Sequence, residues 1–509
     1  MMSEGPLVAV IDVGSNSVRL LVARQLTPTA FEVVDEERFA ARIGQGQVDG
    51  FLTDEGAERG LRALRICAQV AAGHGLAETV AVGTEALRRA PNAAAFCASV
   101  FRETGLRVRM LTADEEAAAS FLGVINSTQL DNGYILDIGG GSLEVITVED
   151  REMVSAKSVP FGALYATERY FRSDRPTAKE VRALRRAVRL AVGDLPSRPL
   201  VIGVGGAVRN LARMQRVSVG YPLRRLHGLT LPRRAVQRMA RALTATDADG
   251  RKRIAGINTD RIGSLPAAAV VIDEVLAAMG ADAIEVSGQG LREGLVWQEL
   301  RRANPIIADV RGASLAGLAH ANGVSELAAE PVVNTARELF AATRRLHSLD
   351  DADLGLLIDG ARLAGIGMHV DYYNRDRHAE YLVHSGDLHG FTHREIVLLG
   401  ALVRFADGGT VTLAEYGRIV APGDERRVAT LAALLGLARA LHRRAPSPVS
   451  RLEAALKKDT LVLRLAGSGP LDAEVYALER ARRRFAEALG VSLELEVETG
   501  SATSQVISK

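Results

Sequence analysis

The sequence predicts an α/β protein with two copies of one fold, followed by a helical region and a small α+β segment. Three observations support this prediction. A segment with an aspartate before a small-residue turn occurs at residues 11–20 and again at residues 136–145. Runs typical of strands and helices alternate around both copies. Beyond residue 304, apolar residues recur at helical spacing with few β-branched runs.

The internal repeat is the most informative feature. Residues 11–20 read IDVGSNSVRL and residues 136–145 read LDIGGGSLEV, so each copy has Asp, an apolar residue, Gly and then Ser at matching positions. Each copy is typical of a β-hairpin, with an aspartate at the end of its first strand. The predicted strands are Leu7–Ile11 with Val18–Ala23, and Tyr134–Leu136 with Leu143–Val148. Two such hairpins, one in each half, indicate a duplicated fold with two facing loops.

The other elements alternate as α/β layers require. Between the hairpins we expect helix Asp54–Gly73, strand Thr79–Gly83, helix Ala93–Thr104, strand Arg107–Leu111 and a helix from about Asp114. After the second hairpin we expect helix Thr177–Val192, strand Leu200–Gly203, helix Pro266–Met279, strand Ala283–Ser287 and helix Leu291–Arg302. The tail is typical of strand Thr460–Leu465, helix Leu471–Leu489 and strand Ser492–Val497.

Proline-containing segments mark the domain boundaries. Asn304-Pro305 stops a helix, and Ala445-Pro446-Ser447-Pro448 separates the helical region from the tail. We therefore predict two α/β lobes at 1–125 and 126–303, a helical domain at 304–445 and a small α+β domain at 446–509.

Composition excludes several classes of protein. A net charge of +2 and an aromatic content of 4% argue against a nucleic-acid partner. No run of about 18 apolar residues predicts a membrane span. Two cysteines are too few for a disulfide framework or a zinc site. Residues 1–6 lack a basic region followed by an apolar core, so we expect no secretory signal and a cytoplasmic location.

The two aspartates, Asp12 and Asp137, would end their strands in one cleft beside turns that suit anions. Backbone N–H groups in glycine- and serine-rich turns approach phosphate closely. The candidate phosphate-binding residues are Gly14, Ser15, Asn16 and Ser17 in the first turn and Gly139, Gly140, Gly141 and Ser142 in the second. Two carboxylates repel phosphate unless a divalent cation lies between them, and Mg²⁺ is the natural choice.

Several segments together resemble the Ppx/GppA exopolyphosphatase and guanosine pentaphosphatase family, which belongs to the superfamily of acetate and sugar kinases, actin and heat-shock chaperones. Besides the two repeats, they are Gly83–Arg88, Glu115-Glu116-Ala117 with Leu122-Gly123, Gly203-Val204-Gly205-Gly206 and Ser287–Gly294. The resemblance is strong over residues 7–300 and weaker to about 405. It implies that both lobes have the actin-like, ribonuclease H-like fold.

The resemblance also implies roles for single residues. Glu116 would be the general base that activates water, and Arg88 would bind phosphate, with the adjacent Arg89 as the alternative. Arg19, Gly205 and Gly206 join the phosphate-binding set. The catalytic set is then Glu116, Arg88 and Asp137, and Asp12, Asp137 and Glu144 would hold Mg²⁺ or its waters.

The predicted activity is release of orthophosphate from the ends of inorganic polyphosphate. Hydrolysis of the 5′ γ-phosphate of guanosine pentaphosphate is the alternative at the same site. A phosphotransferase lacks an evident acceptor site here, and the retained acidic residues argue against a non-catalytic sensor of polyphosphate or guanosine tetraphosphate. The magnesium-dependent enzyme is also expected to pair as a homodimer.

Two further regions leave their interpretation open. Arg182, Arg185, Arg186 and Arg189 form a helical stripe that would either contact a polyanion or simply face solvent, as would the basic cluster at 224–234. The helical region resembles an HD-like domain in which Ala364-Gly365 stands where a His-Asp pair would bind metal. We therefore predict no second metal centre there.

Overall fold

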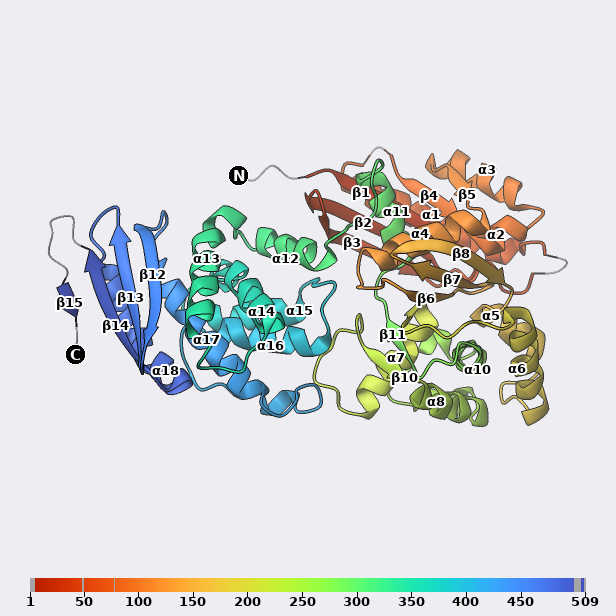
Figure 1. The fold of residues 1–509 in the computed structure, drawn as a ribbon. Coiled ribbons are helices and arrows are strands. Elements are labelled where there is room, and N and C mark those ends of the chain that lie inside the picture. Colours follow the sequence, from red (N-terminus) through yellow and green to blue (C-terminus); the bar gives the residue numbers. More distant parts are fainter. Residues whose placement is uncertain (1–4, 48–49, 77, 499–504, 508–509) are drawn as a thin grey trace. The chain divides into compact units, whose positions relative to one another are not determined.

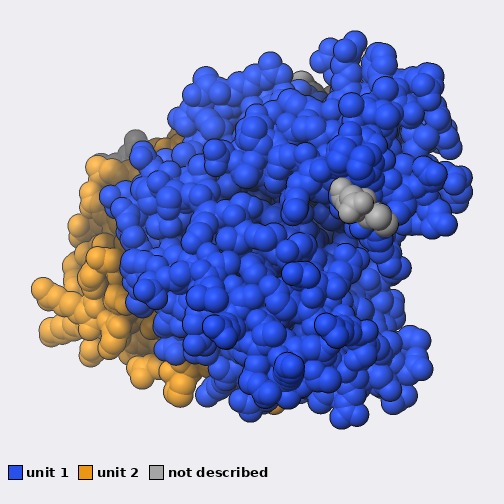
Figure 2. Space-filling view, turned by 90° about the vertical axis from the view of Figure 1, so that its right-hand side faces the viewer, with its two compact units in different colours: residues 1–310 blue, residues 311–509 orange. Residues whose placement is uncertain are grey.

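The computed structural model describes residues 5–47, 50–76, 78–498 and 505–507. The chain divides into two compact units, residues 1–310 and 311–509, which Figure 2 shows in separate colours. The first unit contains two mixed α/β sheets, and the second contains helices followed by a smaller sheet (Figure 1). This is the order of fold types that the sequence predicts. In the part of the chain that is described, no helix is long and apolar enough to cross a bilayer.

The first sheet has the strand order β3-β2-β1-β4-β5. Its strands are β1 (Leu7–Val13), β2 (Val18–Thr27), β3 (Ala30–Phe39), β4 (Val80–Gly83) and β5 (Val108–Met110). Its helices are α1 (Asp54–Gly73), α2 (Glu85–Arg89), α3 (Ala93–Thr104) and α4 (Ala113–Ile125). Strands β1 to β3 are antiparallel, and β4 pairs in parallel with both β1 and β5. The predicted hairpin is confirmed, since β1 and β2 pair from Leu7 opposite Arg24 to Val13 opposite Val18.

The second sheet repeats this plan with the order β10-β11-β9-β6-β7-β8. Its strands are β6 (Gly133–Ile138), β7 (Leu143–Glu149), β8 (Glu152–Val159), β9 (Val201–Val204), β10 (Thr230–Pro232) and β11 (Ala283–Val286). Its helices are α5 (Ala163–Tyr170), α6 (Ala178–Val192), α7 (Gly206–Ser218), α8 (Arg233–Ala245), α9 (Ala248–Lys252), η1 (Thr259–Arg261), α10 (Leu265–Ala278) and α11 (Leu291–Leu300). Strands β3 and β8, which the sequence analysis did not identify, extend each hairpin at its outer side. β3 is mostly half-buried and β8 is mostly exposed, and neither has a continuous apolar run.

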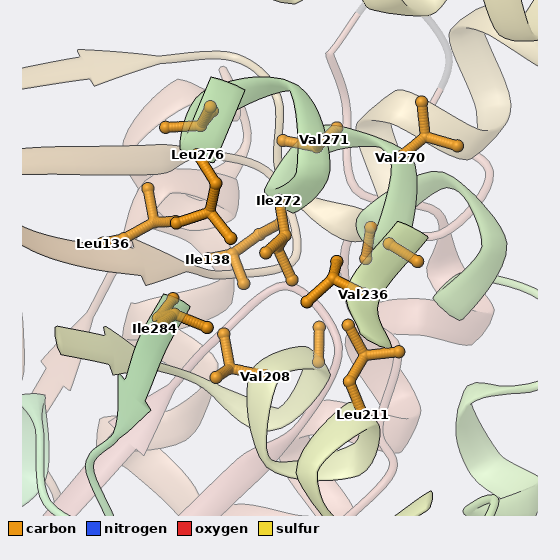
Figure 3. Packing of buried hydrophobic residues seen from close by; sticks show 14 of the residues in the cluster. Leu136, Ile138, Val208, Leu211, Val236, Val270, Val271, Ile272, Leu276 and Ile284 are labelled. Atoms are coloured by element: carbon orange, nitrogen blue, oxygen red, sulfur yellow. The ribbon is translucent and has the colours of Figure 1, made fainter. Parts of the chain in front are cut away.

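Each lobe has a buried apolar core beside its sheet. In the second lobe, Ile138 and Ile284 from the sheet pack against Val208 and Ile272 from the helices (Figure 3). In the first lobe, β1 and β2 pack against α1 through residues such as Leu64 and Cys67. These cores hold the strand ends, and therefore the hairpin turns, in fixed positions.

Helices α4 and α11 cross between the two sheets and join the lobes. Phe121 and other residues of α4 pack on β6, β7 and β9, while Leu295 and Val296 of α11 pack on β1, β2 and β4. A Cβ on Gly123 would lie 2.1 Å from the carbonyl oxygen of Gly290, and one on Gly294 would lie 1.8 Å from that of Ala119. Glycine at both positions is therefore what lets the two helices approach so closely.

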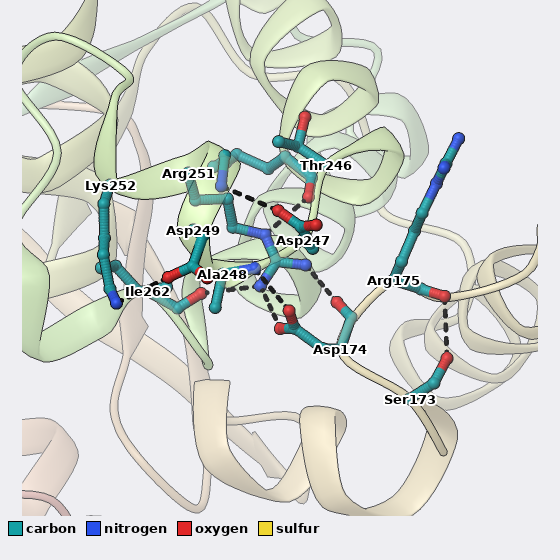
Figure 4. Close-up of polar contacts among 12 residues, drawn as sticks. Ser173, Asp174, Arg175, Thr246, Asp247, Ala248, Asp249, Arg251, Lys252 and Ile262 are labelled. Atoms are coloured by element: carbon teal, nitrogen blue, oxygen red, sulfur yellow. Dashed lines mark hydrogen bonds and ion pairs between the residues drawn. The ribbon is translucent and has the colours of Figure 1, made fainter.

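A buried arginine fixes the segment that leads into the cleft. Arg251 of α9 is 1% exposed and donates to the carbonyl oxygens of Leu243 (2.9 Å) and Ile262 (3.1 Å). It also donates to a carboxylate oxygen of Asp174 at 2.8 Å and to the Asp174 carbonyl oxygen (Figure 4). These bonds hold the chain on both sides of Arg261, a residue of the cleft described below.

The second unit begins with helices and ends with a four-stranded sheet. Its helices are α12 (Val310–Ala321), which starts one residue before the unit, α13 (Glu326–Thr343), α14 (Asp351–Arg362), η2 (Ile366–His369), α15 (Arg375–Ser385), α16 (His393–Phe405), η3 (Ala414–Tyr416), α17 (Asp424–Leu441) and α18 (Asp472–Leu489). The strands are β12 (Val449–Lys457), β13 (Thr460–Gly467), β14 (Ser492–Glu498) and β15 (Gln505–Ile507). Strands β13 and β14 are parallel and are joined through α18, as the predicted strand–helix–strand tail requires.

Candidate active site

A cleft lies where the two hairpin turns meet. The cleft is lined by Asp12, Gly14, Ser15, Asn16, Ser17, Arg19, Thr84, Glu85, Glu116, Ser120, Asp137, Ile138, Gly139, Gly140, Gly141, Ser142, Glu144, Val204, Gly205, Gly206, Arg209, Arg261, Gly290, Leu291, Arg292 and Glu293. The structure thus brings the predicted phosphate-binding and metal-binding residues together. Of the predicted catalytic residues, Glu116 and Asp137 line the cleft and Arg88 lies behind Glu116.

The two turns have the same backbone geometry and face each other. The Gly14 N–H donates to the Ser17 carbonyl oxygen at 3.1 Å, and the Gly139 N–H donates to the Ser142 carbonyl oxygen at 3.0 Å. A Cβ on Gly140 would lie 2.9 Å from the Ser15 Cβ, so the turns approach closely across the cleft. The third glycine segment, Gly205-Gly206, opens α7 and has a φ of +96° at Gly205. Three glycine-containing segments therefore line one space, and turns of this kind are suited to bind anions through backbone N–H groups.

The repeat differs at one charged position. Asp12 lies opposite Arg19 in the first hairpin, whereas Asp137 lies opposite Glu144 in the second. Arg19 Nε donates to Ser17 Oγ at 3.2 Å. Asp137 Oδ2 accepts from Ser120 Oγ at 2.6 Å. Because of this difference, the first turn carries a balanced pair of charges and the second carries two acidic groups.

Glu116 and its neighbour Glu115 have different roles at the start of α4. Glu115 forms the capping box with Thr112, and its side chain accepts from the Thr112 N–H at 2.8 Å. Glu116 instead turns into the cleft, where its Oε2 accepts from Arg88 Nη1 at 2.9 Å. Arg88 Nη1 also donates to the Leu111 carbonyl oxygen at 2.7 Å. Arg88 thus touches the carboxylate that the sequence assigns as base, and its predicted contact with phosphate stays a prediction.

Burial raises the pKa of four carboxyl groups in the cleft, those of Asp12, Glu116, Asp137 and Glu144. It raises the pKa of Glu116 to about 7, even though Arg88 opposes the shift. Burial also raises the pKa of Asp12 and of Asp137, and Asp137 adds to the rise at Asp12. Burial with the charges of Glu116 and Asp137 raises the pKa of Glu144 well above its usual value. Such a group of acids is stabilised by protons or by a bound cation.

The carboxylate oxygens of the cleft are suitable ligands for a divalent cation. Asp12 Oδ1 is buried without a hydrogen-bond partner in the described structure, which leaves it open to a ligand. No three His, Cys, Asp or Glu side chains converge as a ready ligand set among the described residues. Mg²⁺ needs no such set, because it is usually bound by one or two carboxylates and keeps waters and phosphate oxygens as its other ligands.

Three arginines of the cleft were not identified from the sequence: Arg209, Arg261 and Arg292. Arg209 lies one helical turn after Gly205, and this spacing is a signal that sequence analysis can use. Arg261 comes from a distant loop, and a Cβ on Gly206 would lie 2.0 Å from its Nη2. Its position is decided by tertiary structure alone.

Two arginines of the cleft, Arg19 and Arg261, have lowered pKa values. Burial and the charges of Arg209 and Arg292 lower the pKa of Arg19 to about 10. Burial and the charges of Arg19, Arg38 and Arg209 lower the pKa of Arg261 to about 9. Arg261 is only 8% exposed, and its guanidinium makes no hydrogen bond or ion pair with another described residue. Arg261 is therefore a buried cation that suits an anionic ligand, whereas the six carboxylates that line the cleft with four arginines require a cation beside that ligand.

The basic stripe on α6 is partly used inside the fold. Arg185 binds two buried carboxylates of α10, Asp273 at 2.7 Å and Glu274 at 3.0 Å. Arg189 also binds Glu274, and Arg233 of the second basic cluster lies 3.4 Å from Asp273. These arginines tie helices to α10, so part of each basic region is structural.

Cleft and fold together define a class of protein: a two-lobed α/β enzyme that handles phosphoryl groups. Comparison with known proteins gives the family. The profile of the Ppx/GppA phosphatase family matches residues 21–303, and that of its domain III matches residues 310–472. The chain therefore belongs to the Ppx/GppA phosphatase family, whose members are phosphoric-anhydride hydrolases, and it shares their actin-like fold.

Solved structures agree with this assignment. The Aquifex aeolicus member of the Ppx/GppA family is 27% identical, with a TM-score of 0.52 over 59% of this chain and 99% of that one. An exopolyphosphatase-like protein is also 27% identical, with a TM-score of 0.52 over 59% and 100% of the two chains. An exopolyphosphatase from Cytophaga hutchinsonii shares the fold at 23% identity, with a TM-score of 0.53 over 59% and 99%.

Proposed function

We propose that this phosphatase removes the terminal phosphoryl group of inorganic polyphosphate and releases orthophosphate. The observation that carries the proposal is the lining of the cleft. It combines four arginines with glycine turns, and no aromatic side chain is among its described lining residues. Arginine and backbone N–H groups suit a chain of phosphates. A purine base is commonly held by stacking on an aromatic ring, so the lining favours polyphosphate over guanosine pentaphosphate.

In this proposal Glu116 is the general base. A pKa of about 7 leaves a large fraction of this carboxylate ionised at neutral pH and still basic enough to accept a proton. Arg88 donates to Oε2, so Oε1 is the atom that would accept the proton of the attacking water. Arg88 orients the carboxylate through the same bond.

The remaining residues bind and orient phosphate. Asp12 and Asp137 would hold Mg²⁺, with Glu144 nearby, and the bound ion would neutralise charge on the phosphoryl oxygens. The hairpin turns would position the terminal phosphate, and Arg19, Arg209 and Arg261 would offset the charge that develops in the transition state.

The magnitudes support this division of roles. Enzymes typically remove roughly 8–23 kcal/mol of barrier. General base catalysis accounts for about 10²–10⁴-fold, so the arginines, the turns and the cation must provide the rest through positioning and electrostatics.

The test is phosphate release from long-chain polyphosphate and from guanosine pentaphosphate, with Mg²⁺ and with a chelator. We expect turnover of polyphosphate that stops on chelation. Glu116→Gln, and likewise Glu116→Ala, should lower kcat by about 10²–10⁴-fold with polyphosphate binding retained. Preferential hydrolysis of the guanosine substrate would refute the proposed substrate, and unchanged turnover in Glu116→Gln would refute the assigned base.

Two further points belong to the proposal. We propose that the protein acts in the cytoplasm, where phosphate-rich nucleotides and polymers would reach it. We also propose that it pairs as a homodimer, as symmetric dimers are the commonest soluble oligomers. Light scattering at increasing protein concentration tests the second point.

A further inference from the structure

Glu85 is a carboxylate of the cleft that the proposed mechanism does not use. It is the first residue of α2, in the first lobe. A Cβ built on Gly141, in the hairpin turn of the second lobe, would lie 1.4 Å from Glu85 Oε2 and 2.5 Å from its Cδ. The carboxylate thus reaches across the cleft and rests on the glycine turn. It occupies the space that any side chain at position 141 would fill.

The charge of Glu85 is only partly balanced. Arg89, four residues later, donates from Nη1 to Glu85 Oε1 at 3.0 Å. The Arg89 side chain is 59% exposed, whereas that of Glu85 is 13% exposed. Solvent screens the exposed partner, so the pair leaves negative charge on the cleft side, beside Gly141. A phosphoryl group that enters this turn would meet that charge.

We propose that Glu85 determines how tightly the cleft binds phosphate anions and how much divalent cation this binding requires. Without substrate, the carboxylate lies over the Gly141 turn, where an anion would bind. When a phosphoryl group takes this place, Glu85 turns toward Arg89 and the cation reduces the remaining repulsion. The inference rests on the proposed function, because it concerns the same cleft. It adds a residue that sets specificity and leaves the assigned base unchanged.

The test compares two variants that remove the same charge from the same kind of pair. Glu85→Gln keeps the shape of the side chain and removes its charge. Glu58→Gln is the matched control, because Glu58 pairs with Arg62 at the same spacing on α1 but is 76% exposed and outside the cleft. For each protein, KM and kcat for tripolyphosphate and the Mg²⁺ concentration for half-maximal rate are measured at low ionic strength. Thermal unfolding establishes that each variant is folded.

We expect Glu85→Gln to lower KM about tenfold, equivalent to about 1.4 kcal/mol of relieved repulsion, and to lower the Mg²⁺ requirement with it. Glu58→Gln should behave as wild type. Arg89→Gln should raise KM in the wild-type background and have no effect when combined with Glu85→Gln, because Arg89 acts through Glu85.

Other outcomes separate this inference from the proposed function. If wild type hydrolyses tripolyphosphate and Glu85→Gln differs from it by less than about twofold in both KM and Mg²⁺ requirement, the role of Glu85 is refuted and the proposed function stands. A higher KM in Glu85→Gln also refutes it, since the carboxylate would then aid binding. If calorimetry and phosphate release show that wild type neither binds nor hydrolyses tripolyphosphate or long-chain polyphosphate, both proposals are wrong.

Discussion

Replacing Arg88 by Met should shift the pH dependence of the enzyme more than its affinity for substrate. Arg88 donates to Glu116 at 2.9 Å and lowers the pKa of that buried carboxyl, which is still raised to about 7. An opposite charge at this distance changes a pKa by about 1–3 units. Because the Arg88 side chain is 24% exposed, solvent screens it, and we take the lower end of that range.

The expected size of the effect follows directly. A rise of about one unit in the pKa of Glu116 reduces its ionised fraction at pH 7 from about one half to about one tenth, so kcat/KM falls about fivefold there. The loss should disappear at higher pH, where Glu116 is ionised in both proteins. The assay is kcat/KM for polyphosphate from pH 6 to 10 with saturating Mg²⁺.

A matched control separates this effect from general loss of charge. Arg109→Met removes an arginine that pairs with the neighbouring Glu115 at 2.6 Å outside the cleft, so its pH profile should equal that of wild type. A loss in Arg88→Met that is the same at every pH, together with a higher KM, would refute the pKa argument. It would instead support the phosphate contact that the family resemblance implies.

Three other predictions follow from burial and charge. Arg261→Met should raise KM roughly tenfold or more, because it removes a charged hydrogen bond to phosphate. It should also raise the thermal midpoint of the substrate-free protein, because neighbouring arginines repel Arg261. A lower midpoint would contradict this prediction. Arg251→Met should cost about 2–5 kcal/mol in urea unfolding, because it leaves the buried carbonyl oxygens of Leu243 and Ile262 without their donor. Lys252→Met at the surface should cost under about 0.5 kcal/mol. Because Glu116 has a folded pKa raised from 4.5 to about 7, this group should cost the cation-free protein up to about 3 kcal/mol of stability as pH rises from about 4.5 to 7. The loss should be smaller by that amount in Glu116→Gln, where Asp12, Asp137 and Glu144 still contribute. Denaturant unfolding across this pH range with a chelator checks it, and added Mg²⁺ should restore the most stability at the upper end.

Local patterns in the sequence were sufficient to predict the parts of the fold that depend on residues close together in the chain. The hairpins at Asp12 and Asp137 are confirmed because alternation, turn residues and the repeat all act within about ten positions. The outer strands β3 and β8 were missed because their solvent-facing residues mask the alternation. Arg185 was placed correctly on its helix, yet only its neighbours on α10 show that it is bound to Asp273.

The cleft gives a clearer example of what local sequence patterns predict and what only tertiary contacts decide. Glu115 and Glu116 are adjacent and chemically identical, and only the direction of α4 sends one to the helix cap and the other into the cleft. Arg261 carries no motif, and it enters the cleft because the loop after α9 is anchored there by Arg251.

By itself, therefore, the sequence determined the duplicated lobes, the two aspartate-ended turns and the family to which the chain belongs. Those features are encoded in contiguous segments, whose backbone geometry depends on local turn and strand preferences. Only the tertiary structure decided which arginines surround the phosphate turns, that Arg88 contacts Glu116, and that Glu85 lies on Gly141. Those arrangements join residues far apart in the chain, and their burial, which sets each pKa, exists only after the lobes have packed together.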